Sequence, residues 1–570
     1  MDGKKSGFWI ALGLTVGVCS AVSAQDSSPA GVSAEELKTR VERLERQNQE
    51  LVEALKKLQG TVPASGGGEQ PALTNSADPS LNKSDVQRIV DDYLQSIENK
   101  KKAEEEAAKK KEEEEGYKVG TDLKMTARWK DGLLFETAHK DFFAHIGGWL
   151  QYDNVWFNQN KRSLAAPPAG IGDFQDGDFF RRVRLQLDGG FWQVYEYNMI
   201  FGFENTEKSI VSVFELWGGI KDVPYLGMIR VGRMVTPNGL EGDDTTTNKS
   251  MTFFERSSMS DAFYQNFASG IWQGNSILDQ RFCYQSMLYY TDAGLAATSV
   301  GPVGGLNTGD FFGDGEFAAG VRLTGLPLWE NEGRDFVHLG ASFNWHHANR
   351  GGNELTGAQG VRFRARAEQR DFAGDIDGTA HDGVINAGDG NRLVDTGVLV
   401  SEGSSVIGTE FAWVRGPFSL QAEYAWASAN NVLFGGTKIG DAWFDGGYIQ
   451  ASYFLTGESR AYDRRIGRFS PTYIAAVNTP FWFVRDQNGC LNWGIGAWEV
   501  AARWSHLDLN GGNGAIHGGI MDGLTLGLNW YLNTNFKIQF EYVNDERYHV
   551  APGVFPAFVE GFGVRAQVAF

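Results

Sequence analysis

Apolar and polar residues alternate most clearly at the end of the chain, over residues 562–570. One face of an extended strand would carry the apolar side chains of Phe562, Val564, Ala566, Val568 and Phe570. The other face would carry Gly563, Arg565, Gln567 and Ala569. This pattern is typical of a membrane-spanning barrel strand, which contacts lipid on one face and a wet lumen on the other. Taken alone, the segment also fits the edge strand of a soluble sheet.

The same alternation begins near Tyr117 and continues to the end of the chain, in segments of about ten residues separated by Gly, Asn and Asp clusters. In the segment Phe180–Phe203, Gly189-Gly190 is the expected turn of a hairpin. At about 28 residues per strand with its share of loop, the 454 residues from 117 onward predict an all-β transmembrane barrel of about 16 antiparallel strands. Trp530 and Tyr531 are expected in the aromatic girdles at the membrane surfaces.

The segment Val235–Ser269 is too long and too irregular for a tight turn. Long connections of this kind are usually functional. A barrel of about 16 strands encloses an aqueous channel unless something folds into it. We therefore consider two readings: a loop that folds inward and constricts the pore, and a solvated outer loop.

The first residues have the pattern of a secretory signal peptide. Lys4 and Lys5 precede an apolar run, and the small residues 22–24 predict cleavage after Ala24. Beyond the start, no run of 18 or more apolar residues occurs, which excludes a helical membrane protein. The sequence thus predicts a signal peptide over residues 1–24, a helical arm and linker over 25–116, and a barrel over 117–570.

The predicted arm opens with Ser33 and Glu36, the spacing of a helix-capping box. Apolar residues then follow at alternating spacings of four and three: Leu37, Val41, Leu44, Leu51, Leu55 and Leu58. Asn48 fills the one missing position of this heptad seam. The pattern predicts a coiled coil that self-associates, although a lone amphipathic helix packed on its own barrel also fits.

The composition agrees with a single large sheet, because the chain has 72 glycines, 15 prolines and 13% aromatic residues. Its net charge is −19, and without the first 116 residues 36 basic and 50 acidic residues remain, a net charge of −14. An acidic barrel does not favour anions overall. Selectivity, however, depends on the narrowest charged ring, where a low-dielectric constriction focuses the field. We expect no nucleic-acid partner.

Cysteine and acidic clusters give little sign of a metal site. Cys283 and Cys490 are far apart in sequence, which predicts no disulfide scaffold and no metal knuckle and leaves a single bridge open. The segment Asp375–Asp389 is rich in acidic residues and glycine, but it lacks the spacing of a calcium-binding hand. A soluble surface loop is the simpler interpretation. We expect no cofactor.

Several separated segments together resemble the phosphate-selective porin O and P family, over roughly Phe142–Phe570. They are Phe179-Phe-Arg-Arg182, Val231-Gly-Arg233, Phe254-Glu-Arg-Ser257, Tyr453-Phe-Leu-Thr-Gly-Glu458, Gly496-Ala-Trp-Glu499 and Leu526-Gly-Leu-Asn-Trp-Tyr531. The resemblance implies a 16-stranded barrel that assembles as a trimer, passes anions and has no catalytic activity. The predicted arm lies outside it.

Arginines at alternate positions are the strongest chemical feature of the barrel region. Arg362, Arg364 and Arg366 would share one face of a strand, with Arg370 four residues on. Guanidinium groups stay charged and can bind phosphate oxygens in a bidentate way. The resemblance implies that these four residues form an anion-binding arginine ladder. The alternative is that they pair with lumenal carboxylates as a structural support.

Three further residues match the family less closely. Arg181 and Arg182 match a paired arginine, and regular alternation would place only Arg182 on the lumen face, so Arg181 is expected at a strand end. Lys249 stands where the family has a lysine at its central anion site. An exposed loop lysine is the alternative.

The sequence therefore predicts an outer-membrane porin for small anionic solutes, among them phosphate or polyphosphate, with its helical arm in the periplasm. The expected partners are small anions, outer-membrane lipids and two further copies of the chain. An alternative is a structural tether whose arm contacts the cell wall. An enzyme embedded in the membrane is a third class, but we find no nucleophile paired with His139 or His506 in the sequence.

Overall fold

The computed structural model describes residues 117–165, 169–203, 211–243, 249–290, 317–347, 361–370, 392–434, 436–474, 477–481, 484–485 and 488–570. The predicted signal peptide, the helical arm and the acidic segment Asp375–Asp389 lie outside these residues. The described residues belong to one compact unit, Lys111–Phe570.

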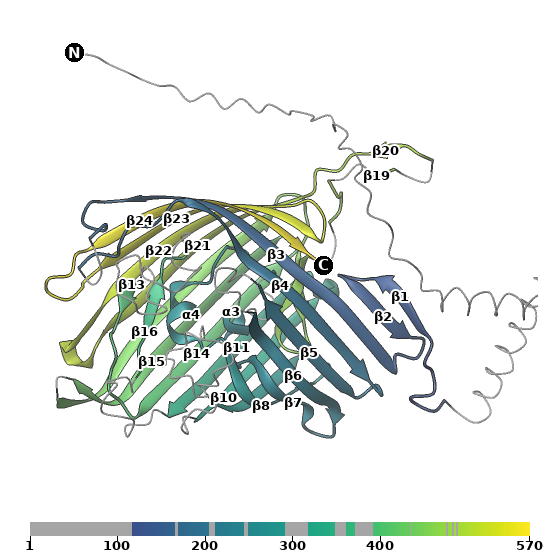
Figure 1. The fold of residues 1–570 in the computed structure, drawn as a ribbon, viewed down its shortest axis with the longest axis horizontal. Helices are drawn as coiled ribbons and strands as arrows, with labels where there is room; N and C mark the ends of the chain where they lie inside the picture. The colour runs from purple at the N-terminus through teal and green to yellow at the C-terminus, as the bar shows by residue number, and fades with distance from the viewer. Residues whose placement is uncertain are drawn as a thin grey trace, which may run out of the picture. The chain divides into compact units, whose positions relative to one another are not determined.

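This unit is a barrel of antiparallel strands (Figure 1). Its wall consists of β3 (Phe142–Gln159), β4 (Gly177–Phe191), β5 (Tyr195–Gly202), β6 (Ser212–Val223), β7 (Gly227–Val235), β8 (Phe267–Ile277), β9 (Phe282–Tyr290), β10 (Phe317–Glu330), β11 (Asp335–His347), β14 (Gly403–Arg415), β15 (Phe418–Phe434), β16 (Thr437–Phe454), β21 (Ala497–Gly511), β22 (Ile516–Tyr531), β23 (Phe536–Tyr548) and β24 (Ala557–Ala569). These are the 16 strands that the sequence predicted.

The last strand closes the barrel. β24 pairs antiparallel with β3, from Val559 opposite Gln159 to Ala569 opposite Trp149. Beyond the strand, Phe570 and Gly148 exchange two backbone hydrogen bonds of 2.6 and 2.9 Å. The closed wall leaves no unpaired strand edge along this part of β3, as a hydrocarbon environment requires.

A short hairpin continues the wall beyond the chain end. β2 (Leu133–Thr137) pairs with Phe143–Ile146 of β3, and β1 (Met125–Trp129) pairs with β2. The edge of β3 that β24 does not reach is thus covered by β2 (Figure 1). This hairpin was not among the elements predicted from the sequence.

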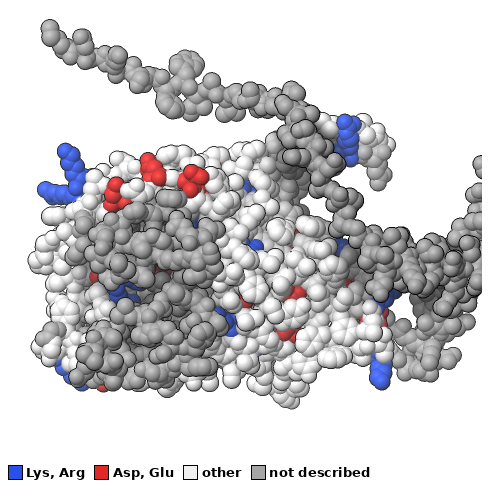
Figure 2. Space-filling view, viewed as in Figure 1, with Lys and Arg blue, Asp and Glu red and all other residues white. Residues whose placement is uncertain are grey.

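Side chains alternate across the wall as predicted. In β24, Phe562 is 44% exposed on the outer face, whereas Arg565 is 1% exposed on the inner face. In Figure 2 the wall is predominantly neither acidic nor basic, and the larger charged groups of the described residues lie towards its margins. One girdle prediction was wrong, because Tyr531 is buried and its hydroxyl donates to Glu499 at 2.9 Å on the inner face. Adjacent residues of a strand point to opposite faces, so Trp530 and Tyr531 could not both face lipid.

The predicted turn at Gly189-Gly190 was also wrong. Both glycines lie within β4, and the chain turns at residues 192–194. Two aromatic side chains explain the glycines. A Cβ atom at Gly190 would lie 2.4 Å from the ring of Phe143, and one at Gly189 would lie 2.7 Å from the ring of Tyr197. These glycines make room for rings and do not reverse the chain.

The two ends of the barrel differ in the length of their connections. Both ends of the described chain lie at one end of the barrel. The connections there are short turns, except for the long connection over residues 455–496. The other end has the connections over 236–266, 291–316 and 348–402. In outer-membrane barrels the short turns face the periplasm and the longer loops face outward. Among the described residues, no helix is long and apolar enough to cross a membrane.

Three connections contribute ordered elements besides the wall. Residues 236–266 contain α3 (Leu240–Asp243) and α4 (Ser258–Phe263). The 348–402 connection contains the two-stranded sheet β12 (Arg364–Arg366) and β13 (Arg392–Asp395). At the opposite end, the 455–496 connection forms the sheets β17 (Arg460–Asp463) with β18 (Arg468–Ile474) and β19 (Val484–Arg485) with β20 (Leu491–Asn492).

Candidate functional site

The connection over residues 236–266 folds into the barrel, as one of the two predicted readings requires. We call it the inward loop. Carboxylates of the barrel wall hold it through its backbone: Glu423 accepts from the amides of Leu240 and Glu241, both at 2.8 Å, and Glu541 accepts from the amide of Phe254 at 2.8 Å. A buried backbone N–H needs a partner, and a carboxylate is a strong one.

Strand β12 lies inside the barrel and has two different faces. Phe363, Ala365 and Ala367 are at most 2% exposed and pack in one apolar cluster with inner-wall residues such as Phe444. The arginines at the alternate positions 362, 364 and 366 are partly exposed. Burial thus alternates along residues 362–367, with the arginines at the more exposed positions.

Five arginines surround two carboxylates at this place. Arg362 binds Asp395 through Nε at 2.8 Å. Arg370 and Arg392 bind opposite oxygens of Asp261 in α4, at 3.1 and 3.3 Å. Arg364 and Arg366 complete the set, and Arg366 stands directly opposite Arg392 in the β12–β13 pair. Like charges that face each other across a strand pair are unfavourable unless a negative charge lies near them.

The surrounding arginines change the pKa of the Asp261 carboxyl. Burial alone would raise the pKa of its carboxyl, but the positive charges of Arg370, Arg392 and Arg366 lower the pKa well below its usual range. The backbone amide of Arg366 also donates to Asp261, at 3.0 Å. Asp261 therefore stays ionised and holds the arginine-bearing strand against α4.

A second cluster surrounds Glu255 of the inward loop. Arg181 binds this carboxylate with two hydrogen bonds of 2.8 and 2.9 Å, and Arg182 binds it at 3.1 Å. Arg565 of β24 reaches it at 3.3 Å and binds Asp153 more closely, at 2.6 Å. Burial would raise the pKa of Glu255, but Arg181 and Arg182 lower it well below the ordinary value.

The placement of Arg181 at a strand end was wrong. It lies within β4, at a shift of register where Gln151 pairs with Arg182 and Tyr152 pairs with Phe180. The extra residue of such a bulge can re-aim a side chain. The bulge lets the consecutive residues Arg181 and Arg182 bind the same carboxylate.

Lys249 precedes the second half of the inward loop, and its backbone oxygen accepts from Gln567 of β24 at 3.0 Å. It is near Trp149 of β3, with 5.9 Å between its ammonium nitrogen and the ring centroid. Burial lowers the pKa of Lys249, which the negative charges of Asp131 and Asp188 partly oppose. The structure therefore does not bring Lys249 together with the arginines of β12.

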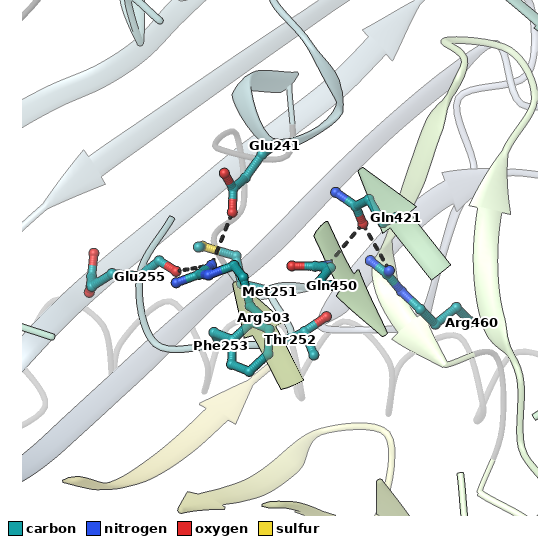
Figure 3. A pocket seen from close by; sticks show the side chains of 9 residues that line it. All are labelled: Glu241, Met251, Thr252, Phe253, Glu255, Gln421, Gln450, Arg460 and Arg503. Atoms are coloured by element: carbon teal, nitrogen blue, oxygen red, sulfur yellow. Dashed lines mark hydrogen bonds and ion pairs between the residues drawn. The ribbon is translucent and has the colours of Figure 1, made fainter. Parts of the chain in front are cut away.

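A pocket of roughly 250 Å³ lies between the inward loop and the wall (Figure 3). Arg503 of β21 reaches it, donating to Glu241 at 3.3 Å and to the backbone oxygen of Glu255 at 3.0 Å. On the other side, Arg460 of β17 donates to Gln421 at 2.9 Å. The remaining lining residues are Met251, Thr252, Phe253 and Gln450.

Four arginines of these clusters were absent from the predicted site: Arg392, Arg460, Arg503 and Arg565. Arg565 had a usable signal, because the alternation in the last strand already places it on the inner face. Arg503 alternates in the same way with the outward Trp504. No local pattern marks Arg392 or Arg460, since their positions depend on segments that fold back into the barrel.

Neither cysteine takes part in a disulfide in the described part of the chain. Cys283 is buried, and its thiol donates to the backbone oxygen of Arg464 at 3.0 Å. Over the same residues, no group of His, Cys, Asp and Glu side chains has the arrangement of a metal site.

Comparisons with known proteins give a consistent family. The family model of the phosphate-selective porins O and P matches residues 167–570. Porin O of Pseudomonas aeruginosa is 27% identical over 462 residues, which cover 77% of this chain and 91% of that protein. An uncharacterised protein of Caulobacter vibrioides is 27% identical over 415 residues, 73% of this chain and 70% of that protein.

Solved structures give weaker similarities. The outer-membrane channel DcaP of Acinetobacter baumannii has a TM-score of 0.42 at 9% identity, covering 76% of this chain and 99% of that one. An anion-selective porin from Comamonas acidovorans has a TM-score of 0.41 at 11% identity, covering 75% and 100%.

Proposed function

Because the chain belongs to the phosphate-selective porin O and P family, we propose that this outer-membrane porin passes small anions, phosphate among them, through a constriction lined by arginines. The arginine cluster around Asp261 and Asp395 carries the proposal. Its five guanidinium groups face two carboxylates. Guanidinium groups stay charged, and a phosphate could be bound by them in a bidentate way.

The seven predicted residues have different roles in this proposal. Arg362, Arg364, Arg366 and Arg370 form the main anion-binding face on and beside β12. Arg181 and Arg182 form a second step, where Glu255 limits how tightly an anion is held. Weak binding at several steps is what conduction requires. Lys249 would attract anions nearer the short-turn end of the barrel.

The acidic composition of the barrel does not oppose this function. Glu423, Glu541 and Glu368 face the lumen, yet each accepts a backbone amide of the inward loop. Glu368 also binds Arg503 at 2.7 Å. These carboxylates are buried and occupied, so they anchor the constriction and contribute little to its exposed charge.

We further propose a trimer, with the helical arm in the periplasm. The short turns and the start of the described chain lie at the same end of the barrel, the end that faces the periplasm in such proteins. The arm itself lies outside the described residues. No observation favours the tether or an enzyme, and we propose neither.

The test is the reversal potential of the purified protein in a planar bilayer under a salt gradient. We expect anion selectivity for the wild type and a large loss of it in the triple variant R362Q/R364Q/R366Q, which removes three charges but keeps hydrogen-bonding groups. Phosphate permeability should fall more than chloride permeability, because the bidentate grip is lost. The matched control R334Q/R415Q/R485Q changes three exposed arginines outside the clusters and should behave as the wild type. Unchanged selectivity in the first variant would make these arginines structural supports.

A further inference from the structure

The connection over residues 455–496 crosses the rim of the barrel at the short-turn end. Its first half reaches the lumen, where Phe469 of β18 packs against Phe336 on the inner face of β11, with 6.1 Å between the ring centroids. Its last part, residues 488–496, includes β20 and leads into β21. We call this last part the rim segment. Figure 1 shows β19 and β20 standing off from the wall.

The rim segment is attached to the outer face of the wall, which is the face that contacts lipid. Trp498 of β21 and Trp530 of β22 pair in register, and their rings stack with 5.0 Å between centroids. Both rings lie on the outer face, because the next residues along their strands, Glu499 and Tyr531, are buried on the inner face. The indole nitrogens of the two tryptophans donate to the backbone oxygen of Ile495, at 3.0 and 2.9 Å. The segment therefore joins the wall on its lipid side.

The chain just before the rim segment is fixed at the same place. The amide of Gly496 donates to the backbone oxygen of Thr479 at 2.9 Å, and the amide of Phe481 donates to that of Leu532 at 2.8 Å. The ring of Phe481 lies edge-on against Trp530, with 4.8 Å between centroids. These backbone groups are hydrogen-bonded within the protein, as a position beside lipid requires.

Apolar side chains at alternate positions of the rim segment are exposed. Leu491, Trp493 and Ile495 are 41, 75 and 61% exposed. Leu455 and Val500 are exposed on the wall beside them, and the amide of Leu455 donates to the backbone oxygen of Trp498 at 2.7 Å. The exposed apolar surface of the segment is thus continuous with the lipid-facing surface of the wall, whatever contacts the rest of each side chain makes.

The backbone of the hairpin limits how deeply it can lie in a membrane. β19 and β20 pair over only two residues each. So short a ladder satisfies few backbone groups, and the hydrocarbon core of a membrane offers no partners for the others. Apolar and tryptophan side chains on such a backbone fit the boundary between headgroups and acyl chains, where water is also within reach.

We propose that the rim segment is an interfacial membrane anchor, which places the side chains of Leu491, Trp493 and Ile495 in the phospholipid of the periplasmic leaflet. One connection then contacts lipid outside the barrel and packs on the wall inside it. The membrane would hold the outer half of a connection whose inner half lies in the channel. The inference concerns the membrane and not the solute, so it does not depend on the proposed anion selectivity.

The experiment measures the depth of a nitroxide label on the full-length protein in phosphatidylcholine vesicles. Oxygen concentrates among acyl chains and a nickel chelate stays in water, so their effects on the label distinguish lipid, water and protein around it. The label is attached in C490S/I495C, since Cys490 is the exposed cysteine of the described residues and Cys283 is buried. C490S/A502C, on the outer face of β21, is the reference for lipid, and C490S/K438C, at the long-loop end, is the reference for water.

We expect the label at position 495 to lie about 5–10 Å inside the level of the phosphates, deeper than the label at 438 and shallower than the label at 502. A label at 495 that the nickel chelate reaches as readily as it reaches position 438 would place the segment in water and overturn the proposal. A label shielded from both oxygen and nickel would be covered by protein, such as a second copy of the chain, and would also overturn it.

A second measurement leaves all three apolar side chains in place and labels the native Cys490. We expect this label to be partly shielded from nickel in the wild type. In L491S/I495S its accessibility to nickel should rise to that of the water reference. The matched control L164S/V398S changes two exposed apolar residues in connections at the long-loop end and should behave as the wild type. Gel mobility before and after heating shows that each barrel is folded. Unchanged shielding in folded L491S/I495S would overturn the role of these side chains as an anchor.

Discussion

At the scale of single residues, two lumenal arginines, Arg503 and Arg565, combine an ion pair with a ring contact. Arg503 lies 4.7 Å from the ring centroid of Phe253, and Arg565 lies 4.4 Å from that of Phe254, both on the inward loop. Arg460 lies 3.5 Å from the ring of Phe469. A guanidinium held on its face and its edge has few rotamers left. The charges of Arg503 and Arg565 are therefore fixed in place before an anion arrives.

The charge of Lys249 gives a prediction about pH. Burial lowers its pKa from the usual value for lysine of about 10.4, so the residue loses its proton on the alkaline side of neutrality before ordinary lysines do. We expect anion selectivity to decrease as the pH rises from 7 towards 10. In K249M this alkaline decrease should be smaller, and selectivity at pH 7 should already be reduced.

Reversal potentials at several pH values check this. K438M is the matched control, since Lys438 is exposed at the start of β16. A variant K249M with the full alkaline decrease would show that another group titrates. On the acid side, Glu255 and Asp261 have lowered pKa values, so their pairing with arginine is complete at neutral pH and is lost only when the pH falls through those lowered values. Selectivity should accordingly stay constant between pH 7 and 5.

At the scale of elements, the inward loop depends on the carboxylates of the wall. Glu423 accepts two adjacent amides of α3 and a hydrogen bond from Tyr448, at 2.5 Å. In E423Q the side-chain amide can accept fewer of these donors, at a cost of about 0.5–1.5 kcal/mol for the lost hydrogen bond. We expect the loop to move more freely, single-channel conductance to rise and anion selectivity to fall.

The loop prediction is checked with single-channel recordings of the folded variant. E332Q, in the exposed turn between β10 and β11, is the control and should leave conductance unchanged. E423D should restore part of the wild-type conductance and anion selectivity, because it keeps the carboxyl group. If E423Q folds and conducts as the wild type does, the loop is held by its other contacts.

The strands could be predicted from the sequence better than the site. Alternation and composition were enough to predict the number of strands, 16, and the two faces of β24, because each strand has one lipid-facing side. The bulge at Arg181 and the glycines at positions 189 and 190 were missed, since bulges and close ring contacts have no periodic signal. The apolar inner face that receives Phe363 was missed for another reason. A lumen position can be apolar where a loop covers it, and the covering loop is distant in sequence.

At the scale of the whole molecule, closure of the barrel depends on the chain end. Phe570 forms two backbone hydrogen bonds with Gly148, and its ring lies 3.3 Å from the place of a Cβ atom at Gly148. F570S removes an apolar side chain from the closing strand, so we expect less folded barrel in the outer membrane with unchanged export. F555S, in the loop between β23 and β24, is the matched control. Heat-resistant folded protein, measured by gel mobility, should decrease in F570S alone. Equal amounts in both variants would contradict the prediction.

The first described residues are held at the rim of the barrel, directly after the predicted arm. Asp141 accepts from the amide of Gly120 at 2.5 Å and from Gln193 at 2.7 Å, and it also binds the hydroxyl of Tyr117. The ring of Tyr117 stacks on His139 with 3.9 Å between centroids. The chain therefore enters each barrel at a defined point. In an assembly of several barrels, three arms would start from equivalent points.

This gives the last prediction, that residues 33–59 associate as a trimer and strengthen the assembly of the barrels. The heptad seam with Asn48 at one inner position supplies the association and fixes its register. A peptide of these residues should be helical and trimeric in sedimentation, and N48L should be more stable but less specific in oligomer number. Deletion of residues 25–116 should lower the temperature at which the detergent-solubilised trimer separates into folded monomers. A peptide that stays monomeric, together with a deletion protein whose trimer dissociates at the wild-type temperature, would show that the barrels associate without the arm.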